Sequence, residues 1–468
     1  MPNDHFDLVV LGAGSAAREA AARATADHGK AVALVERLRW GGDCPNVACK
    51  PTKQYVAAAE LLHDTRAIAH ELGIDLAAAP LFDLARLKER KDWLVGTQEA
   101  WRKRLDDAGY HTVAGEGRFV NARTIAVGDR RLTAEHVLIA TGSRTAIPPV
   151  SGIEDVDWLD HVSALELTEL PRSMAILGAG AVGLEFAQVF SRFGTKVTLV
   201  EGAPRIAPLA DADTAAEVHV ALADEGIEIA TNTFATAVER DGDHLALTLA
   251  PRDDSPERQV PVERLLLAAG RVPNLEELEL ERVGVEATRA GIKVDEHMRT
   301  TTGGIWAAGD VTATIQLTPI AGYQAQVAVD DMFGDGSRVA DYSALPSAIF
   351  TDPELAGVGL TEGDARERGF DVETASYDAR SLIRPYYLDD APHDLLKLVF
   401  ERGSRRLLGV HAAVRGASEL LQGYALALRL GATLDDLALS HYAFPTYGEG
   451  LHYAAEAVLA EAAAARAS

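Results

Sequence analysis

The sequence contains only two cysteines, Cys44 and Cys49, and they lie close together. A disulfide framework for stability would need more cysteines, spread along the chain. In a reducing compartment, a close pair is more often catalytic or metal-binding than structural. A zinc site needs about four soft or borderline ligands, and no histidine lies near the pair. The pair therefore predicts a redox-active dithiol, with structural zinc as the weaker alternative.

The residues around the pair favour thiolate chemistry. A helical pattern begins just after the segment from Gly41 to Lys53 and continues through Leu62. The positive end of a helix lowers the pKa of a nearby thiol, and Lys50 and Lys53 would act in the same direction. A thiolate is the form that exchanges with disulfides.

Two glycine-rich turns are candidates for the elements that position the reacting groups. The first, Gly12 to Ala17, follows an apolar strand and leads into an alanine-rich helix. A second strand then ends at Glu36. The same order recurs at Gly178 to Gly183, with Glu201 in the place of Glu36.

A strand–turn–helix–strand unit of this kind is suited to binding a dinucleotide. The glycines allow a tight turn and a close approach of the backbone to a pyrophosphate, and the helix N-terminus binds the phosphates. The acidic residue accepts hydrogen bonds from a ribose. One such turn could be a plain tight turn, but two in the same context predict two dinucleotides, one held and one exchanged.

Size and composition are those of an ordinary soluble globular protein. The chain has 468 residues, 47% hydrophobic and 25% charged, which predicts two to four domains. Its formal charge of -25 argues against binding to nucleic acid or to an anionic membrane. No apolar run reaches the roughly 18 residues of a membrane span, and the first residues lead straight into a strand, so we expect a cytoplasmic location.

The motifs together resemble the FAD-dependent pyridine nucleotide–disulfide oxidoreductases, which include dihydrolipoamide dehydrogenase, glutathione reductase and mercuric reductase. The resemblance runs from Asp7 to about Ala455. Besides the two turns and the cysteine segment, its markers are Ala140-Thr-Gly-Ser143, Ala269-Gly-Arg-Val-Pro-Asn274, Ala308-Gly-Asp310 and Phe350-Thr-Asp-Pro353.

The resemblance implies an α/β fold with two Rossmann-like dinucleotide-binding domains and a C-terminal α+β dimerisation domain. We expect residues 1–150 and 275–340 to bind FAD and residues 151–274 to bind NAD(P). Residues 341–468 would form the interface of a homodimer.

The resemblance also implies roles for individual residues. Cys49 would face the flavin as the charge-transfer thiolate, and Cys44 would be the outer, interchange thiol. The residues implied to hold FAD are Gly12, Gly14, Ser15, Glu36, Gly42, Asp43, Lys53, Gly115, Thr141, Gly142, Ser143 and Asp310. Those implied for the nicotinamide side are Gly178, Gly180, Gly183, Glu201 and Gly270.

Charged residues beside the two dinucleotides add to these implied roles. Lys53 would pair with Glu185 and place an ammonium beside the flavin, where it stabilises the reduced, electron-rich form; the plain alternative is two solvated charges. Glu201 should welcome a ribose hydroxyl and repel a 2′-phosphate, which favours NADH over NADPH. Arg205 could partly offset that repulsion.

The chain departs from the family pattern near its C-terminus. Members that reduce organic disulfides carry His-Pro-Thr-x-x-Glu, and the histidine acts as an acid–base in the partner's active site. Here the segment is Phe444-Pro-Thr-Tyr-Gly-Glu449, and phenylalanine cannot transfer a proton. His441 or Tyr447 would have to replace it. The resemblance implies a catalytic role for Glu449, which without a histidine to orient would only anchor the interface.

Mercuric reductases also lack that histidine, but they use a further C-terminal cysteine pair, and no cysteine follows Cys49 here. We therefore expect an NADH-dependent FAD enzyme that passes electrons through Cys44 and Cys49 to a soft metal ion, a disulfide or another oxidant. The alternatives are a flavin diaphorase or quinone reductase with regulatory cysteines, and a flavin-based redox sensor.

Overall fold

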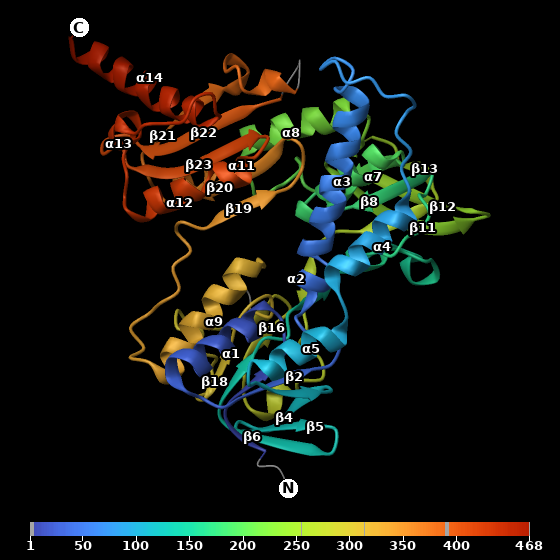
Figure 1. Cartoon of the computed structure of the whole chain (residues 1–468), viewed down its shortest axis with the longest axis vertical. Helices are drawn as coiled ribbons and strands as arrows, with labels where there is room; N and C mark the ends of the chain where they lie inside the picture. Colours follow the sequence, from blue (N-terminus) through green and yellow to red (C-terminus); the bar gives the residue numbers. More distant parts are fainter. Residues whose placement is uncertain (1–3, 254, 313, 389–392, 468) are drawn as a thin grey trace. The chain divides into compact units, whose positions relative to one another are not determined.

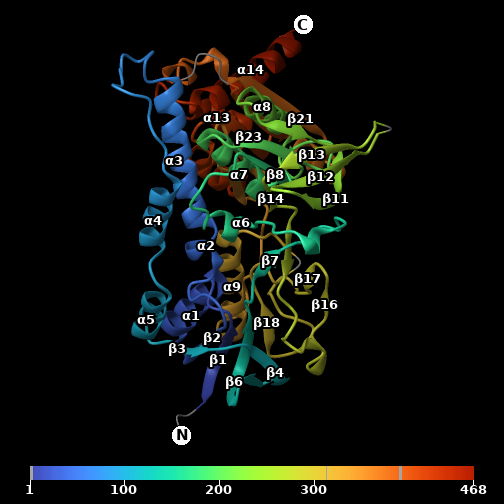
Figure 2. The same ribbon diagram turned by 90° about the vertical axis from the view of Figure 1, so that its right-hand side faces the viewer.

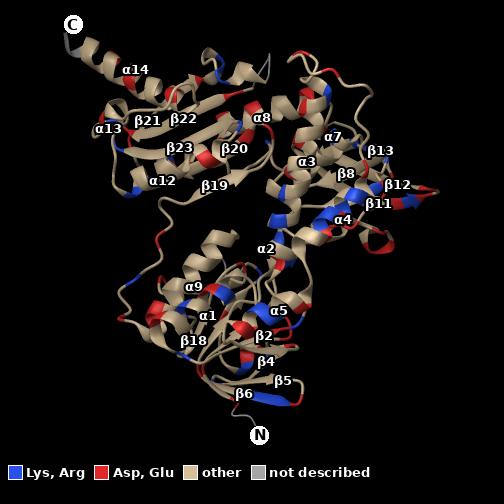
Figure 3. Cartoon of the chain, viewed as in Figure 1, with Lys and Arg blue, Asp and Glu red and all other residues tan. Residues whose placement is uncertain are grey.

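The computed structural model describes residues 4–253, 255–312, 314–388 and 393–467. The chain forms two compact units (Figure 1). The first unit comprises Met1–Thr52, Lys88–Ala146 and Gly270–Asp341, and the second comprises Lys53–Leu87, Ile147–Ala269 and Tyr342–Ser468. Acidic and basic residues are interspersed along both units (Figure 3).

The first unit is built on one mainly parallel sheet. Strand β1 (His5–Leu11) lies between β2 (Val32–Glu36) and β6 (Arg130–Ile139), parallel to both. The apolar residues of β1 and β2 are almost all buried, as expected of parallel strands covered on both faces. The other strands of this sheet are β3 (His111–Ala114), β4 (Gly117–Asn121), β5 (Thr124–Val127) and β18 (Ile305–Ala307).

Helices cover this sheet and carry its turns. Helix α1 (Ser15–His28) packs along α9 (Thr318–Phe333), and Figures 1 and 2 both show the two side by side. Buried alanines on α1 permit this close packing. The remaining helices here are α2 (Asp43–Asn46), α5 (Gln98–Asp107), most of α4 (Leu84–Val95) and the first turn of α3 (Cys49–Ala67).

Small strands complete the first unit beside its main sheet. Strand β7 (Ser143–Thr145) pairs with β15 (Arg271–Pro273), which joins two motifs far apart in the sequence. Strands β16 (Ala287–Thr288) and β17 (Gly291–Ile292) form a hairpin next to the short helix η2 (Leu280–Arg282).

The second unit repeats the strand–turn–helix–strand order. Strand β8 (Ser173–Leu177) leads through the second glycine turn into α7 (Ala181–Phe193) and then β9 (Lys196–Val200). These strands form a parallel sheet with β10 (Glu228–Ala230) and β14 (Arg264–Leu267). Helix α8 (Ala212–Asp224) precedes β10, and η1 (Ile153–Asp155) and α6 (His161–Ala164) precede β8.

An antiparallel sheet accompanies it and corrects one expectation. The polar and charged composition of Pro251 to Pro261 predicts a surface loop. This prediction is wrong for the end of the stretch, where β13 (Arg258–Val262) pairs with β12 (His244–Pro251), which pairs with β11 (Thr233–Asp241). Burial of alternate residues, Val260 and Val262, provides the driving force that the polar composition conceals.

The C-terminal part of the second unit is an antiparallel sheet with helices. Its strand order is β19 (Pro346–Ile349), β20 (Glu354–Gly359), β23 (Leu407–Val414), β22 (Leu395–Glu401) and β21 (Val372–Asp378). The helices are α10 (Glu362–Glu367), η3 (Ala379–Ser381), η4 (Pro385–Tyr387), α11 (Ala417–Leu420), α12 (Gln422–Arg429), α13 (Leu434–Leu439) and α14 (Gly448–Ala467).

The architecture agrees with the expected fold class. Two glycine turns open two parallel strand–helix units, and an α+β segment follows the second. The boundaries of the three domains remain a prediction, because the division into two compact units does not test them. Within the described residues, no helix is both long and apolar enough to cross a membrane.

Candidate functional site

The first glycine turn brings backbone segments into contact. Gly12 has a positive φ of 117°, and a Cβ there would collide with the carbonyl oxygen of Ala140. Gly42 has a φ of 76°, and a Cβ there would collide with Gly14. The turn and the cysteine loop therefore touch through bare backbone, which leaves their amide groups accessible to a phosphate.

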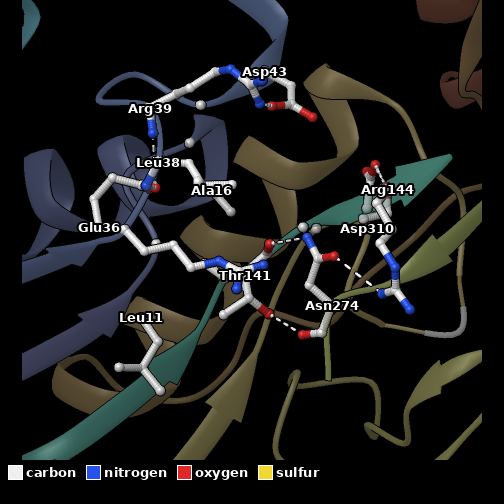
Figure 4. A pocket seen from close by; sticks show the side chains of 18 of the residues that line it. Leu11, Ala16, Glu36, Leu38, Arg39, Asp43, Thr141, Arg144, Asn274 and Asp310 are labelled. Atoms are coloured by element: carbon white, nitrogen blue, oxygen red, sulfur yellow. Dashed lines mark hydrogen bonds and ion pairs between the residues drawn. The ribbon is translucent and has the colours of Figure 1, made fainter. Parts of the chain in front are cut away.

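Glu36 lies at the end of β2 and is fixed by backbone amides. Its carboxylate accepts hydrogen bonds from the N–H groups of Ala13 (2.9 Å), Leu38 (2.7 Å) and Arg39 (3.1 Å). Figure 4 shows this carboxylate in the pocket beside Leu38 and Arg39. Carboxylate oxygens have several lone pairs, so Glu36 retains acceptor capacity for a ribose.

A cavity of about 430 Å³ in the first unit begins at this turn. Its volume falls in the range of small-molecule and cofactor pockets. The predicted FAD residues that line it are Gly12, Gly14, Ser15, Glu36, Gly42, Asp43, Gly115, Thr141, Gly142, Ser143 and Asp310. Cys44 lines it as well. The glycine cradle and the fixed carboxylate fit a dinucleotide such as FAD.

Sequence reasoning missed several residues of this cavity. Arg271 donates to Asp43 Oδ2 (3.1 Å) and, through Nε, to Ser143 Oγ (2.7 Å). Ser143 in turn donates to Asp310 Oδ2 (2.6 Å). This series of hydrogen bonds connects Asp43, the residue before Cys44, to Asp310, the predicted flavin-binding aspartate. Arg271 belongs to the motif Ala269-Gly-Arg-Val-Pro-Asn274, but only the pairing of β7 with β15 shows what its side chain contacts.

Asn274 is a second missed residue of the cavity. Its carbonyl oxygen accepts from Thr141 Oγ1 (2.8 Å), and its side-chain amide donates to the backbone carbonyl of Thr141 (2.9 Å). Figure 4 shows these bonds beside Arg144 and Asp310. They fix the predicted segment from Thr141 to Ser143 against the residues that follow β15.

The two cysteines lie together as free thiols. Cys44 is part of α2, and Cys49 is the first residue of α3. Their side chains hydrogen-bond to each other. Cys49 Sγ also lies 3.6 Å from Thr318 Oγ1, at the start of α9. No local sequence pattern indicates Thr318, which comes from far along the chain.

The pKa of the Cys44 thiol is raised, whereas the sequence predicted that it would be lowered. The hydrogen bond to Cys49 and burial raise the pKa of Cys44, whereas a hydrogen bond with Thr318 and the charge of Arg18 lower it. Lys50, expected to help, points its ammonium at the carbonyl oxygen of Leu94 (2.6 Å). The prediction of a lowered pKa is therefore wrong for Cys44 in its thiol form.

The second glycine turn reproduces the first. Glu201 Oε2 accepts from the N–H of Ala179 (2.7 Å), and Oε1 accepts from the N–H of Ala203 (2.7 Å). Glu36 makes the equivalent bonds with Ala13 and Leu38. The third glycine, Gly183, packs against the turn so closely that a Cβ would collide with the carbonyl oxygen of Gly178. Gly180 forms the N-cap of α7.

Arg205 is committed to its own loop. Its Nη1 donates to the carbonyl oxygen of Ala207 (2.8 Å), and its Nη2 donates to those of Pro208 and Ala210 (2.8 Å each). These hydrogen bonds to carbonyl groups of the loop after β9 hold the guanidinium in place.

Lys53 and Glu185 form the expected pair within the second unit. Lys53 Nζ lies 2.7 Å and 2.6 Å from the two carboxylate oxygens of Glu185. The ammonium also lies over the ring of Phe350, 4.4 Å from its centre, and the N–H of Phe350 donates to Glu185 (3.1 Å). The reading of two solvated charges is wrong, because Glu185 is buried.

The C-terminal segment contains Phe444, Glu449 and the two candidate replacements for the histidine, His441 and Tyr447. The side chain of Phe444 is 74% exposed. Glu449 is buried and accepts from the N–H of Thr446 (2.7 Å). Burial, the charge of Asp394 and a hydrogen bond to it raise the pKa of Tyr447. His441 is exposed.

Two dinucleotide turns, a cavity lined by Cys44 of the cysteine pair and a lysine–glutamate pair are the features of a flavin- and nicotinamide-dependent oxidoreductase. Residues 6–325 match the family model of the pyridine nucleotide-disulphide oxidoreductases, and residues 345–455 match the dimerisation domain of the same family. The chain belongs to this family, whose members use FAD and NAD(P)H, and its dimerisation domain indicates a homodimer.

Its relatives include enzymes of two activities. The chain is 36% identical to a mercuric reductase of Streptomyces lividans over 466 residues, covering 98% of this chain and 97% of the relative. It is also 36% identical to a dihydrolipoyl dehydrogenase of Thermus scotoductus over 459 residues, covering 97% of each.

A solved structure is similar in both fold and extent. The HOCl-induced flavoprotein disulfide reductase RclA of Escherichia coli matches with a TM-score of 0.84 and 28% identity, over 96% of this chain and 99% of that chain. A Cu(II) complex of RclA matches equally well, with a TM-score of 0.84. The expected fold class, cofactor pair and enzyme class are thus confirmed, whereas the electron acceptor is not determined.

Proposed function

We propose that this enzyme oxidises NADH and delivers the electrons, through FAD and the Cys44–Cys49 pair, to a soft metal ion such as Hg²⁺ or Cu²⁺. The observation that carries the proposal is the exposed Phe444 in place of an acid–base histidine, in a chain that keeps both cysteines. The S. lividans relative is named a mercuric reductase, and RclA has been solved with Cu(II).

A metal acceptor suits this site chemically. Reduction of an organic disulfide releases a thiol that must gain a proton, and a positioned acid–base is worth about a hundred- to ten-thousand-fold in rate. A soft metal ion binds thiolates and accepts electrons without receiving a proton. The balances are NADH + Hg²⁺ → NAD⁺ + Hg⁰ + H⁺ and NADH + 2 Cu²⁺ → NAD⁺ + 2 Cu⁺ + H⁺.

The residues of this chain would divide the work as follows. The cavity residues, among them Gly12, Glu36 and Asp310, would hold FAD, which would supply two-electron transfer between NADH and the disulfide. Cys49 would be the inner thiol and Cys44 the outer one. Lys53, oriented by Glu185 and Phe350, would hold a positive charge beside the flavin. Glu449 would anchor the segment after Phe444 rather than orient a base.

NADH is the proposed donor rather than NADPH. Glu201 presents a carboxylate at the end of β9, fixed by two backbone amides. Arg205, which could have neutralised a 2′-phosphate, is held by loop carbonyl groups instead. We also propose that the enzyme works as a homodimer in the cytoplasm.

The test is anaerobic NADH oxidation by the FAD-loaded enzyme with Hg²⁺, Cu²⁺, lipoamide, oxidised glutathione and a quinone as acceptors. We expect turnover with the metals to exceed turnover with the disulfides. Cys44→Ser and Cys49→Ser should each lower metal reduction by more than about a hundredfold, as removal of an essential nucleophile does. Ala48→Gly, which changes the residue before Cys49 and leaves both thiols, serves as the matched control.

One observation favours a second candidate, a quinone reductase in which the cysteines are regulatory. The pKa of Cys44 is raised by its hydrogen bond to Cys49 and by burial, which disfavours a reactive thiolate. In that case, quinone turnover would persist in both cysteine variants and would exceed metal turnover in the unmodified enzyme. Such a result would replace the metal-reductase proposal.

A further inference from the structure

A segment of the first unit contacts the loop that carries both cysteines. We call residues 40–50 the redox loop and residues 94–102, which run from the end of α4 into α5, the supporting segment. The guanidinium carbon of Arg102 lies 5.5 Å from the centre of the Trp40 ring. One residue along each segment, a Cβ on Gly41 would stand 2.9 Å from the indole of Trp101, so the backbone of the redox loop packs on that ring.

Two further contacts continue in the same order. Gln98 Nε2 donates to Asn46 Oδ1 (2.9 Å), which lies between the two cysteines. Lys50 Nζ donates to the carbonyl oxygen of Leu94 (2.6 Å). The supporting segment thus runs antiparallel to the redox loop and contacts it at both ends and in the middle.

Asn46 is the central contact of this arrangement. Its side chain is 5% exposed, and its Nδ2 donates to the carbonyl oxygens of Trp40 (2.9 Å) and Gly42 (2.7 Å). Both amide hydrogens are therefore used, and the side-chain oxygen can only accept. Gln98 supplies the donor. Gln98 Oε1 is buried and has no hydrogen-bond partner among the described residues, so the amide of Gln98 serves the redox loop rather than its own helix.

The supported loop holds the two sulfurs in contact. Cys44 lies in α2 and Cys49 begins α3, and the two free thiols hydrogen-bond to each other. The sulfurs therefore meet while all contacts to the supporting segment are in place. Closure of the disulfide needs no change in those contacts, so their energies are common to the oxidised and the reduced loop.

We propose that Gln98 and Trp101 are positioning residues that set the reduction potential of the Cys44–Cys49 disulfide. In the oxidised enzyme the S–S bond itself restricts the loop, whereas in the reduced enzyme only noncovalent contacts do so. Without the supporting segment, the reduced loop gains conformational freedom that the oxidised loop cannot gain, and reduction becomes more favourable. This inference goes beyond the proposed function, because it concerns the cysteine pair itself, whichever acceptor receives the electrons.

The experiment measures the equilibrium of the cysteine pair with dithiothreitol. FAD-loaded enzyme is equilibrated without oxygen, at one pH, over a range of ratios of reduced to oxidised dithiothreitol. The S–S bond of the enzyme breaks as the S–S bond of oxidised dithiothreitol forms, and two electrons and two protons pass to the enzyme. Alkylation followed by mass spectrometry then counts the free thiols at Cys44 and Cys49.

Four variants test the two positioning residues. Gln98→Met keeps the length of the side chain and removes the hydrogen bond to Asn46, so we expect the equilibrium constant for reduction to rise about three- to tenfold, or about 15–30 mV for a two-electron couple. Trp101→Leu should raise the constant as well. Trp101→Phe, which keeps a ring against Gly41, should stay within about twofold of the unmodified enzyme. The matched control is Glu99→Gln, at an exposed position of the same helix, which should also stay within about twofold.

The outcomes separate a positioning role from a structural one. A constant that falls, or that stays within about twofold, in Gln98→Met would overturn the inference, and so would an equal rise in Glu99→Gln. Lower thermal stability with an unchanged constant would leave these residues a structural role only. If Trp101→Leu did not fold, Gln98→Met would decide, because Gln98 is partly exposed. The assay contains neither NADH nor an acceptor, so failure of the proposed metal reduction would leave its result valid.

Discussion

Replacing Glu201 with glutamine should weaken the preference for NADH over NADPH. The carboxylate stands at the end of β9, with its two oxygens fixed by the N–H groups of Ala179 and Ala203. Two unit charges about 4 Å apart interact by about 1 kcal/mol in water and about 4 kcal/mol near a protein surface. A repulsion of about 1.5–3 kcal/mol between Glu201 and a 2′-phosphate corresponds to about ten- to hundredfold in selectivity.

The assay is the ratio of kcat/KM for NADH to that for NADPH, measured with one acceptor. Glu201→Gln should lower this ratio by about ten- to hundredfold, mainly by improving NADPH. Glutamine has one acceptor oxygen, so one of the two backbone amides loses its partner, at a cost in stability of about 1 kcal/mol. Thermal unfolding reports that cost separately from the kinetics.

The structure offers two controls for this reasoning. Glu36→Gln changes the matching residue of the first turn and should weaken retention of FAD without altering the choice of nicotinamide. Arg205→Ala should leave the ratio unchanged, because its guanidinium is bound to loop carbonyl groups. An unchanged ratio in Glu201→Gln, or a larger change in Arg205→Ala, would refute the assignment of Glu201.

Three further predictions concern other parts of the chain. Phe444→His should raise lipoamide reduction by about tenfold or more and leave metal reduction within about twofold; equal effects on both acceptors would contradict it. Lys397→Met should lower the free energy of unfolding by about 3–5 kcal/mol, because Lys397 is 1% exposed and binds Asp211 (3.0 Å), Asp213 (2.6 Å) and Glu362 (3.1 Å); urea titration measures it. Phe350→Leu should slow flavin reduction by NADH by about threefold or more, because it removes an attraction of about 1–2 kcal/mol for the Lys53 ammonium; an unchanged rate in rapid mixing would refute this.

The Lys397 cluster also predicts how stability depends on pH. Burial lowers the pKa of Lys397, but hydrogen bonds to Asp213 and Asp211 raise it overall. Its contribution is therefore full below the ordinary lysine pKa and is lost as pH rises through the raised value. Burial raises the pKa of Asp211, but His411 and Lys397 lower it overall, so that contribution is lost as pH falls through the lowered value. In Lys397→Met, urea titrations should show that the free energy of unfolding falls less at high pH and at low pH than in the unmodified protein. An unchanged dependence on pH would contradict the role given to the Lys397 cluster.

Local features of the site were predictable from the sequence. The two turns and the acids at Glu36 and Glu201 follow a short pattern, since each lies within one strand–helix–strand unit. Helical periodicity predicted a helix from just after Lys53 through Leu62, whereas α3 begins earlier, at Cys49, and continues to Ala67. The pairing of Lys53 with Glu185 came from the family resemblance, because the two residues are far apart in the sequence.

Features that depend on distant segments were not predictable. Arg271 and Thr318 reach the first-unit cavity from beyond the second glycine turn, and no local pattern records their contacts. The raised pKa of Cys44 depends on burial and on its neighbour, which outweigh the charge and dipole effects that the sequence suggests. The strand β13 was missed because its polar residues conceal two buried valines.

The most direct test of the central claim is a count of thiols during anaerobic titration with NADH. Air-oxidised, FAD-loaded enzyme should have no reactive thiol before the titration and two per chain, identified as Cys44 and Cys49, after one equivalent of NADH. A second equivalent should then reduce the flavin. If the flavin bleached with the first equivalent while both sulfurs stayed unreactive, the cysteine pair would lie outside the electron path and the account would be wrong.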